Sequence, residues 1–391
     1  MTSALDGIRI IDASRVLGGP YCAQILADHG ADVIKIEPPE GDETRGWGPP
    51  FLGDAASYFL GLNRNKRSIA IDFGHELGRE LLLKLLAGAD VFIENFKIGT
   101  LERWGLGDDL LAEKFPRLIR CRVTGFGADG PYGGRPGYDA ALQALCGLMS
   151  VNGEKDGRPL RVGLPVVDMV TGLNAALGVV LALQARQSTG RGQLVESALY
   201  DNGISLLHPH IPNFLLSGIV PGRSGNAHPN ITPYDSYATA SGDIFLAVGN
   251  NRQFATLAGI LGLPELPADP RFASTAARNI HREELREIIE QALATHQAAE
   301  ISERLITSGV PCAPVRRVDD VVADPHTAAR GMIVEVDGVA GTASPVKLDE
   351  TPASYRMRPP GFAEHTDEIL AEIGCDGGGF EPAIVRRVRG S

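Results

Sequence analysis

The alternation of short apolar runs with longer helical patterns constrains the fold of this chain more than any other feature of its sequence. A strand–helix–strand order of this kind predicts a parallel sheet that is covered by helices. Ligands of such sheets usually bind at the carboxyl ends of the strands. The runs that predict strands are 8–11, 33–36, 68–73, 91–93 and 118–123, and those that predict helices are 21–29, 76–86 and 109–114.

The rest of the chain predicts a further helix and strand of this sheet and then a different unit. A long helix rich in Ala and Leu is expected at 169–187 and a strand at 193–200. His, Pro, Asn and Gly then become frequent over 208–234, as in a linker or a site loop. Strand patterns at 236–240 and 244–248 flank a Ser-Gly-Asp turn and predict a hairpin. Helices are expected at 251–261, 282–295, 299–308 and 366–373, the last with Thr366 as its cap.

Composition excludes several classes of protein. The chain has 391 residues, 43% of them hydrophobic, which is enough for two or three domains. Its net charge of −11 argues against a general nucleic-acid binder. The five cysteines are scattered without CxxC spacing and are typical of buried thiols in a reducing compartment. The first residues lack the pattern of a signal peptide, and no apolar run approaches the roughly 20 residues of a bilayer span. A cytoplasmic protein with no nucleic-acid or membrane partner is therefore expected.

The N-terminal region has the order of a dinucleotide-binding unit. A strand, the glycines of Gly18-Gly19-Pro20, a helix and a second strand that ends in Glu37 follow one another. An acid in that position can hold a ribose hydroxyl. The full glycine fingerprint is absent, however, and two glycines also suit a tight turn. An NAD(P)-dependent oxidoreductase is thus one alternative.

Basic residues gather in one part of an otherwise acidic chain. Arg45, Arg64, Lys66, Arg67, Lys97 and Arg103 all fall between residues 45 and 103. Residues 64–67 directly precede an expected strand, and Lys97 follows another. Cationic side chains and turn amides that meet at strand ends can bind phosphate. A solvated charged surface would explain any one of these residues equally well.

Asp168 is a single acid in an apolar stretch, residues 163–172, at the start of the long helix. Aspartate is a favoured N-cap, and that role alone would justify its presence. A carboxylate exposed at such a turn can also attack a thioester carbonyl, to give a mixed anhydride and then an enzyme-bound thioester. The helix dipole would keep the carboxylate ionised. The spacing does not choose between the two roles.

Together these segments resemble the family III CoA-transferases, also known as the CaiB/BaiF family. The resemblance covers nearly the whole chain in the right order. It is carried by residues 16–20, 30–37, 41–45, 65–68, 94–97, 137–139 and the Asp168 segment, and later by 223–234, 248–254 and 364–366.

The resemblance implies the fold, the domains and the assembly. It implies an α/β fold in which a Rossmann-like large domain is joined to a smaller α/β domain, and an interlocked homodimer. The large CoA-binding domain would comprise residues 1–205, with a linker at 206–233. The small domain would comprise 234–325, and 326–391 would be a linker and a return to the large domain.

The resemblance also implies the site. Asp168 falls on the family's catalytic aspartate, and CoA or acyl-CoA acts as a substrate rather than as a tightly bound cofactor. No metal is expected, since His208, His210 and His228 have no carboxylate spaced with them. The substrate pocket would include Arg15, Leu17, Tyr138, Gly225, Asn226 and His228. Contacts with CoA would come from Asn65, Lys66, Arg67, Asn95, Phe96, Lys97 and Arg103.

Departures from related enzymes narrow the substrate. Formyl-CoA:oxalate transferases resemble this chain but carry Gln in the place of Leu17 and a run of glycines in the place of 224–229, which weighs against formate and oxalate. Pro38-Pro39 replace a basic residue that stacks on adenine in some members. The loop 223–230 offers polar groups for the far carboxylate of a dicarboxylic acid. The implied reaction is CoA transfer from an acyl-CoA donor, succinyl-CoA, to a short dicarboxylate.

An α-methylacyl-CoA racemase is the alternative inside the family. That chemistry needs an acid/base group on each face of the α-carbon. Racemases use a histidine thirty residues before the aspartate, and Tyr138 takes that position here. An ordinary tyrosine, with a pKa near 10, is a poor base at neutral pH.

Overall fold

The computed structural model describes residues 3–375 and 384–386, and contacts between residues divide the chain into two compact units. The large unit contains the described residues up to Leu148, Val162–Leu206 and those from Pro325 onward. The small unit contains Met149–Arg161 and Leu207–Asp324. The segment 149–161 thus joins the small unit, although it was expected in the large domain, and so does the expected linker from residue 207 onward.

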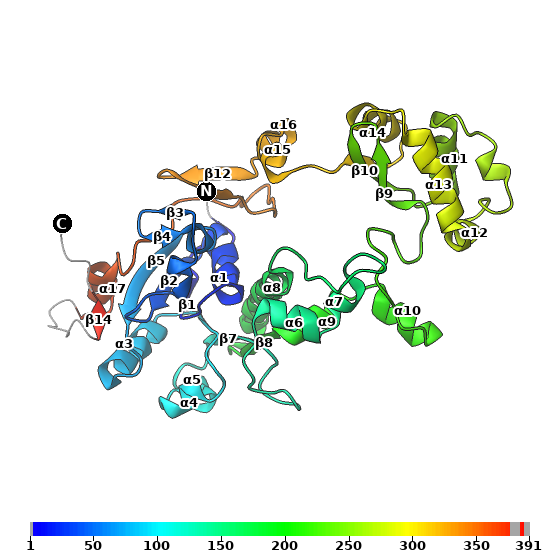
Figure 1. Ribbon diagram of the computed structural model, residues 1–391. Helices are drawn as coiled ribbons and strands as arrows, with labels where there is room; N and C mark the ends of the chain where they lie inside the picture. The colour runs from blue at the N-terminus through cyan, green and yellow to red at the C-terminus, as the bar shows by residue number, and fades with distance from the viewer. Residues whose placement is uncertain (1–2, 376–383, 387–391) are drawn as a thin grey trace. The chain divides into compact units, whose positions relative to one another are not determined.

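The described part of the large unit is built on a seven-stranded sheet in the order β14-β5-β2-β1-β6-β7-β8 (Figure 1). Six of these strands pair in parallel, and β14 pairs antiparallel with β5. Numbered along the chain, the parallel strands follow the order 3-2-1-4-5-6 of the Rossmann sheet, whose switch point lies between the first and fourth strands. The strands are β1 (Arg9–Asp12), β2 (Asp32–Glu37), β5 (Lys66–Ile71), β6 (Val91–Glu94), β7 (Ile119–Thr124), β8 (Leu194–Ala198) and β14 (Val385–Arg386).

Helices cover both faces of this sheet because its strands are apolar on both sides. Ile10 and Val33 pack with one cluster that includes residues of α1 and α8, and their neighbours Ile11 and Ile34 pack with another that includes residues of α3 and α17. This alternation has the period of two that a strand requires. The other elements of the unit are α1 (Gly18–Asp28), η1 (Glu43–Gly46), β3 (Phe51–Leu52), β4 (Ala55–Ala56), α2 (Ser57–Leu60), α3 (Glu76–Ala87), α4 (Thr100–Arg103), α5 (Asp108–Lys114), α6 (Asp139–Leu145), α7 (Leu148–Val151, which crosses into the small unit), α8 (Val166–Thr189), α9 (Leu199–Ser205), α16 (Pro325–Ala329), β12 (Ile333–Val336), β13 (Val339–Thr342) and α17 (Thr366–Glu372).

The small unit has its own sheet and its own core. Three strands pair in the order β11-β10-β9, and β9 and β10 form the predicted hairpin. The three helices predicted over 251–308 are present, whereas α12 was not predicted and α10 lies where a linker was expected. The elements are α10 (His210–Ser217), β9 (Tyr234–Thr239), β10 (Gly242–Ala247), α11 (Asn251–Ile260), η2 (Leu266–Ala268), α12 (Thr275–Ile280), α13 (Arg282–Leu293), α14 (Ala298–Thr307), β11 (Cys312–Pro314) and α15 (Val318–Val322).

Many boundaries differ from the sequence prediction by one to three residues, and four of the differences bear on the site or on a stated role. The strand expected from residue 68 begins at Lys66, and the helix expected from residue 169 begins at Val166. The strand expected at 193–200 ends at Ala198, where α9 follows. Thr366 is the first residue of α17 rather than its cap, and its hydroxyl donates to the carbonyl of Ala363.

The expectation that no apolar run suffices for a bilayer span needs correction at α8. This helix has 24 residues and a mean hydropathy of 1.9 in its most apolar window, so by length and composition alone it could cross a membrane. Core helices of soluble proteins also meet this criterion. In the structure, α8 packs against α1, β7 and β8.

Candidate active site

Two loops meet at the switch point of the large sheet. One follows β1 and carries Arg15, and the other follows β6 and begins at Asn95. The Asn95 carboxamide joins them, because its Oδ1 accepts from the Arg15 amide at 2.9 Å and its Nδ2 donates to the Arg15 carbonyl at 2.8 Å. This is the edge at which the sequence predicted a site.

The loop after β1 is strained just before it enters α1. Val16 has a φ of 69°, a left-handed conformation that a β-branched residue rarely adopts. The helix begins two residues later, at Gly18, so the two glycines that suggested a tight turn are helical instead.

The glycines of this region allow α1 and α8 to approach each other closely. A Cβ on Gly172 of α8 would lie 2.7 Å from the carbonyl oxygen of Gly18. A Cβ on Gly18 would lie 3.7 Å from Oδ1 of Asp168. The Asp168 carboxylate therefore stands beside the first turn of α1.

Asp168 lies in the first turn of α8 and does not cap it. The capping carboxylate is that of Asp139, whose Oδ2 accepts from the amides of Val167 at 2.8 Å and of Asp168 at 3.1 Å. The structural role considered for Asp168 is thus filled by another residue, which leaves the Asp168 carboxylate to face the cavity described below.

The environment of Asp168 favours its protonated form. Burial, and then the charge of Asp139, raise the pKa of Asp168 to about 7. The expectation that the helix dipole keeps this carboxylate ionised is therefore wrong in direction, because desolvation and a like charge outweigh the dipole. Burial, and then the charges of Asp168 and Asp139, also raise the pKa of Tyr58 to about 12.

A cavity of about 230 Å³ at this edge brings Asp168 together with six of the predicted residues. They come from the loops after β1 and β6 and from the segment before α6. They are Arg15, Leu17, Asn95, Phe96, Lys97 and Tyr138.

A second cavity, of about 340 Å³, adjoins the first and shares Arg15, Phe96 and Lys97 with it. Pro38 and Pro39 lie in its wall. So do Phe73, Phe96 and Trp104, whose rings meet edge to face, with centroids 5.3 Å apart for Phe96 and Trp104 and 5.8 Å for Phe73 and Trp104. The two cavities form a path to Asp168 from an aromatic end, whose lining also includes Glu37, Glu40 and Asp72.

Arg15 and Lys97 are the cations that line both cavities, whereas Arg135 lines the first cavity alone, with its guanidinium over the Tyr132 ring. The Arg15 and Lys97 side chains are exposed, and neither of them has a hydrogen bond or ion pair through its charged group within the described residues. Their charges are therefore free to meet an anionic ligand.

Lys66 was predicted to contact CoA, and the structure places it elsewhere. It is fully buried, and its ammonium donates to Asp12, to the carbonyl of Pro20 and to Asn63. Three acceptors take all three of its hydrogens, so none is left for a phosphate. Burial lowers the pKa of Lys66 to about 8.

Asn65 and Arg67 are engaged in the same way. The side-chain amide of Asn65 donates to Asp28 and to the carbonyl of Ser354. Arg67 pairs with Asp32 and with two carboxylates of α17. The physical reason is the earlier start of β5, which puts these residues at the amino end of a parallel strand, away from its carboxyl end.

Four other predicted residues lie outside these cavities. Arg103 is exposed at the end of α4 and donates to Thr100. Gly225, Asn226 and His228 belong to the small unit. There, Asn226 donates to Ser236, and the His228 ring lies 5.0 Å from that of Tyr234. Their roles in substrate binding stay predictions.

Sequence reasoning missed three residues of the site. Glu43 lines the cavity of Asp168, and Asp139 and Tyr58 surround that carboxylate electrostatically. Glu43 and Asp139 stand inside segments 41–45 and 137–139, which had been noted without a role for either residue. No comparable feature of the sequence pointed to Tyr58. Within residues 3–375 and 384–386, no group of three His, Cys, Asp or Glu side chains could hold a metal ion.

Comparison with known proteins identifies the relatives of this chain. The model of the family described as "CoA-transferase family III" matches residues 5–366. Succinate--glutarate CoA-transferase of Agrobacterium fabrum is 41% identical over 381 residues, which cover 94% of this chain and 95% of that protein. Succinyl-CoA:mesaconate CoA-transferase of Haloarcula hispanica is 38% identical over 390 residues, 96% of this chain and 98% of that protein. A crystal structure of a CAIB/BAIF family protein from Brucella suis superimposes with a TM-score of 0.86 and 42% identity, and it covers 95% of this chain and 100% of that one.

Proposed function

The chain belongs to CoA-transferase family III and is a CoA-transferase, and on that premise we propose that it moves CoA from succinyl-CoA to a short dicarboxylic acid with Asp168 as the nucleophile. The observation that carries the proposal is the position of Asp168. Its carboxylate faces the cavity at the switch point, beside Arg15 and Lys97, while Asp139 performs the capping that would otherwise explain it.

In the proposed reaction the carboxylate of Asp168 carries first an acyl group and then CoA. An Asp168 oxygen attacks the thioester carbonyl of the donor, the C–S bond breaks, and an acyl-aspartyl anhydride and CoA thiolate form. The thiolate then attacks the aspartyl carbonyl, which releases the first acid and leaves an aspartyl-CoA thioester. The acceptor carboxylate attacks the carbonyl of this thioester, the C–S bond breaks, and a second anhydride and CoA thiolate form. The thiolate finally attacks the acceptor's acyl carbon, which gives the new acyl-CoA and frees Asp168.

The raised pKa of Asp168 suits this role. Only the ionised carboxylate attacks, and a pKa of about 7 leaves a large ionised fraction at neutral pH. A carboxylate of raised basicity is also a better nucleophile than an ordinary one, since nucleophilicity generally rises with basicity.

The two adjoining cavities offer a place for CoA. We place its adenosine end in the aromatic cavity, where Pro38 and Pro39 stand in the position of the basic stacking residue of some relatives. Arg15 and Lys97, which line both cavities, would meet its phosphates, and the thioester would reach Asp168. The geometry supports this path, because the same cations border both ends.

The choice of acceptor rests on relatives and on Leu17. The names of several relatives specify glutarate, mesaconate, D-citramalate or L-malate. Leu17 is almost fully buried at the cavity of Asp168 and offers no hydrogen bond to a small polar acid such as oxalate. The loop 223–230 as the binder of the far carboxylate stays a prediction.

A competition assay tests the substrate. Purified protein receives succinyl-CoA together with glutarate, malate, mesaconate, itaconate, oxalate and hexanoate at equal concentration, and mass spectrometry follows each new acyl-CoA. We expect the four larger dicarboxylates to give products at least ten times faster than oxalate or hexanoate. Fastest turnover of oxalate or hexanoate would overturn the substrate class and leave the Asp168 chemistry standing.

Because the chain belongs to a family of CoA-transferases, the oxidoreductase alternative is abandoned. A second measurement tests the racemase alternative. A racemase removes and returns the α-proton, so it would introduce deuterium into a 2-methylacyl-CoA in D₂O. We expect no such incorporation, because Tyr138 stands where racemases have histidine.

We also propose an interlocked homodimer in a reducing, cytoplasmic compartment. All five cysteines are free and buried, which suits such a compartment.

The proposal of a dimer is supported by an apolar stripe that α8 presents to solvent. Leu173, Leu177, Val180 and Leu181 are 44%, 56%, 42% and 61% exposed. Their spacing puts them on one helix face, and a second copy of the chain is the partner that the resemblance implies.

A further inference from the structure

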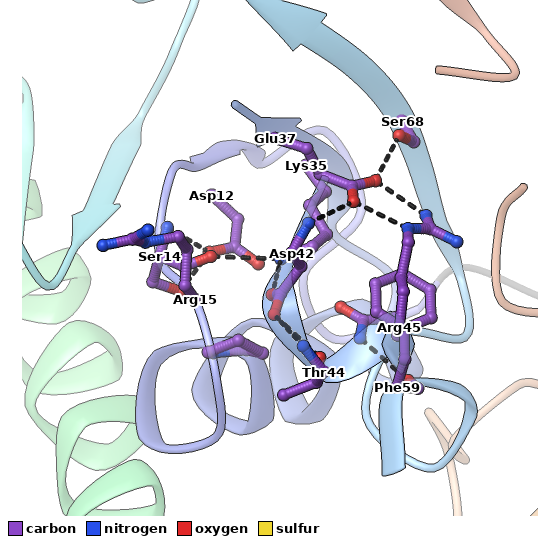
Figure 2. Close-up of polar contacts among 12 residues, drawn as sticks. Asp12, Ser14, Arg15, Lys35, Glu37, Asp42, Thr44, Arg45, Phe59 and Ser68 are labelled. Atoms are coloured by element: carbon purple, nitrogen blue, oxygen red, sulfur yellow. Dashed lines mark hydrogen bonds and ion pairs between the residues drawn. The ribbon is translucent and has the colours of Figure 1, made fainter. Parts of the chain in front are cut away.

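Lys35 is a fully buried lysine that joins two segments of the active site. It projects from β2, and its ammonium donates to the carbonyl of Ser14 at 3.0 Å and to Oδ2 of Asp42 at 3.0 Å. Ser14 immediately precedes Arg15 in the loop after β1, and Asp42 immediately precedes Glu43. Figure 2 shows Lys35 with Ser14 and Arg15 on one side and Asp42 on the other.

Both of these segments line the cavity of Asp168. The loop after β1 contributes Arg15 and Leu17, and the second segment contributes Glu43. Asp42 fixes the second segment, since its Oδ1 accepts from both the amide and the hydroxyl of Thr44 at the start of η1. One ammonium group therefore sets the relative position of two walls of the cavity.

The loop after β1 needs such support because it is strained. The left-handed backbone of Val16 persists only when the surrounding contacts hold it. Lys35 holds the carbonyl of Ser14 on one side of Val16, and Asn95 holds both backbone groups of Arg15. Lys66 holds the carbonyl of Pro20 on the other side.

Stability does not explain why the charges of Lys35 and Asp42 are buried beside the cavity of Asp168. Lys35 and Asp42 are both in the interior, with side chains 0% exposed. Apolar residues of similar volume often replace a buried ion pair without loss of stability, whereas removal of one partner is strongly destabilising. The charges of Asp42, Asp12 and Glu37 outweigh burial and raise the pKa of Lys35, so the lysine stays charged.

We propose that Lys35 is a positioning residue of the transfer reaction: it holds the loop of Arg15 and Leu17 and the turn of Glu43 at the separation that lets the thioester meet Asp168. Lys35 lines neither of the two cavities, and it acts through Ser14 and Asp42. The inference rests on the proposed function of Asp168. A displacement of about 1 Å in such a site commonly lowers the rate about 100-fold.

The test separates positioning from stability with a charge-neutral pair. Lys35→Met alone leaves Asp42 buried and unpaired, and we expect it to lose both thermal stability and activity. Lys35→Met with Asp42→Asn removes the unpaired charge. This double variant is expected to recover most of the melting temperature and to form the CoA adduct on the peptide of residue 168 about 100-fold more slowly than wild type.

Arg186 provides the matched control. It is a buried cation that also donates to one carboxylate, Asp90, and to one backbone carbonyl, that of Arg117. It lies 18 residues from Asp168 along α8, roughly 27 Å at the rise of a helix. Arg186→Met with Asp90→Asn is expected to form the adduct at the wild-type rate.

Amide hydrogen exchange supplies a readout that does not depend on catalysis. The amides of residues 13–17 are expected to exchange faster in the double variant at Lys35 and Asp42 than in wild type or in the Arg186 control. Wild-type rates of adduct formation and unchanged exchange in that variant would overturn the positioning role. If wild type forms no adduct at residue 168, the proposed function fails, and the exchange rates alone then decide whether Lys35 holds the loop.

Discussion

Asp168 combines a reactive role with a position that costs stability. Its pKa is about 7 in the folded protein, against an ordinary value of 3.8. Between these values the folded state binds more protons than the unfolded state, so the contribution of this group to stability falls as the pH rises through that window. A reactive carboxylate is thus kept in a site that partly opposes its ionisation.

Replacement of Asp168 by Asn should therefore stabilise the protein while it abolishes transfer. The amide has no charge to desolvate and cannot form the anhydride. At pH 8 we expect an increase of about 1–3 kcal/mol in the free energy of unfolding, and at pH 4 little difference, because the native aspartate is then protonated. Urea unfolding at both pH values checks this. A variant that is less stable at pH 8, or that keeps several per cent of the activity, would contradict the assignment.

The charge of Asp139 should set the pH at which Asp168 becomes active. Adduct formation in wild type should rise with pH and reach half of its maximum near pH 7. In Asp139→Asn the side-chain oxygen can still accept from the amides of α8, but the like charge is gone. The midpoint should then move to lower pH. Rapid-quench measurements from pH 5 to pH 9 give both curves, and a midpoint that stays or rises would exclude this electrostatic role.

The same distinction between free and engaged charges applies to the CoA contacts. Lys97 has no partner in the described residues, whereas Lys66 has three. Lys97→Ala should raise the KM for acyl-CoA about tenfold or more, in a salt-dependent way, and leave the KM of the acceptor acid nearly unchanged, because a charge-assisted contact contributes about 1.5–3 kcal/mol. Arg191→Ala, on the exposed loop after α8, is the control. An effect of Lys97→Ala on the acceptor alone would refute the placement.

At the scale of the elements, the sequence predicted most strands and helices, because their hydrophobic periods are strong. It failed where tertiary packing overrides local preference. Gly18 and Gly19 have low helix propensity and precede a proline, yet they form the first turn of α1. Packing explains Gly19, because a Cβ there would lie 2.3 Å from the Ser14 side chain.

Contacts between segments that are distant along the chain were the part of the site that could not be predicted from the sequence. The cap of α8 comes from Asp139, 29 residues before Asp168. The partners of Lys66 lie on other elements, and the sequence showed only a lysine beside an arginine. Asp168 itself was identifiable, because a single acid in an apolar stretch and the family resemblance pointed to the same residue.

The close approach of α1 and α8 predicts the effect of a single methyl group. Gly172→Ala would place a Cβ 2.7 Å from the carbonyl oxygen of Gly18 and 3.0 Å from the Tyr21 ring, so the helices must separate. We expect a loss of about 1–3 kcal/mol in the free energy of unfolding, and slower adduct formation at Asp168. Gly259→Ala, in α11 with no atom within 4 Å of the new Cβ, should instead stabilise by about 0.5–1 kcal/mol. Equal effects of the two changes in a thermal or urea melt would contradict this account.

At the scale of the whole molecule, the net charge and the local charges differ in sign. The chain carries −11, yet the path between the two adjoining cavities is bordered by Arg15 and Lys97. Such an arrangement puts positive charge where the anionic substrate is proposed to bind, while the net negative charge of the chain disfavours nucleic acid and other polyanions.

The exposed stripe of α8 gives the last prediction, which concerns assembly. Apolar side chains at 173, 177, 180 and 181 would remain in water in a monomer, and burial of such side chains in an interface contributes about 25 cal/mol per Å². Wild type should therefore sediment and scatter light as a species of twice the chain mass. Leu177→Glu with Leu181→Glu should shift it towards the monomer, because two carboxylates would have to be buried without partners. Ile280→Glu, which changes a side chain that is 79% exposed on the small unit, is the matched control and should leave the mass unchanged. A wild-type monomer at micromolar concentration, or a double variant that stays dimeric, would show that this face of α8 is not where two copies meet.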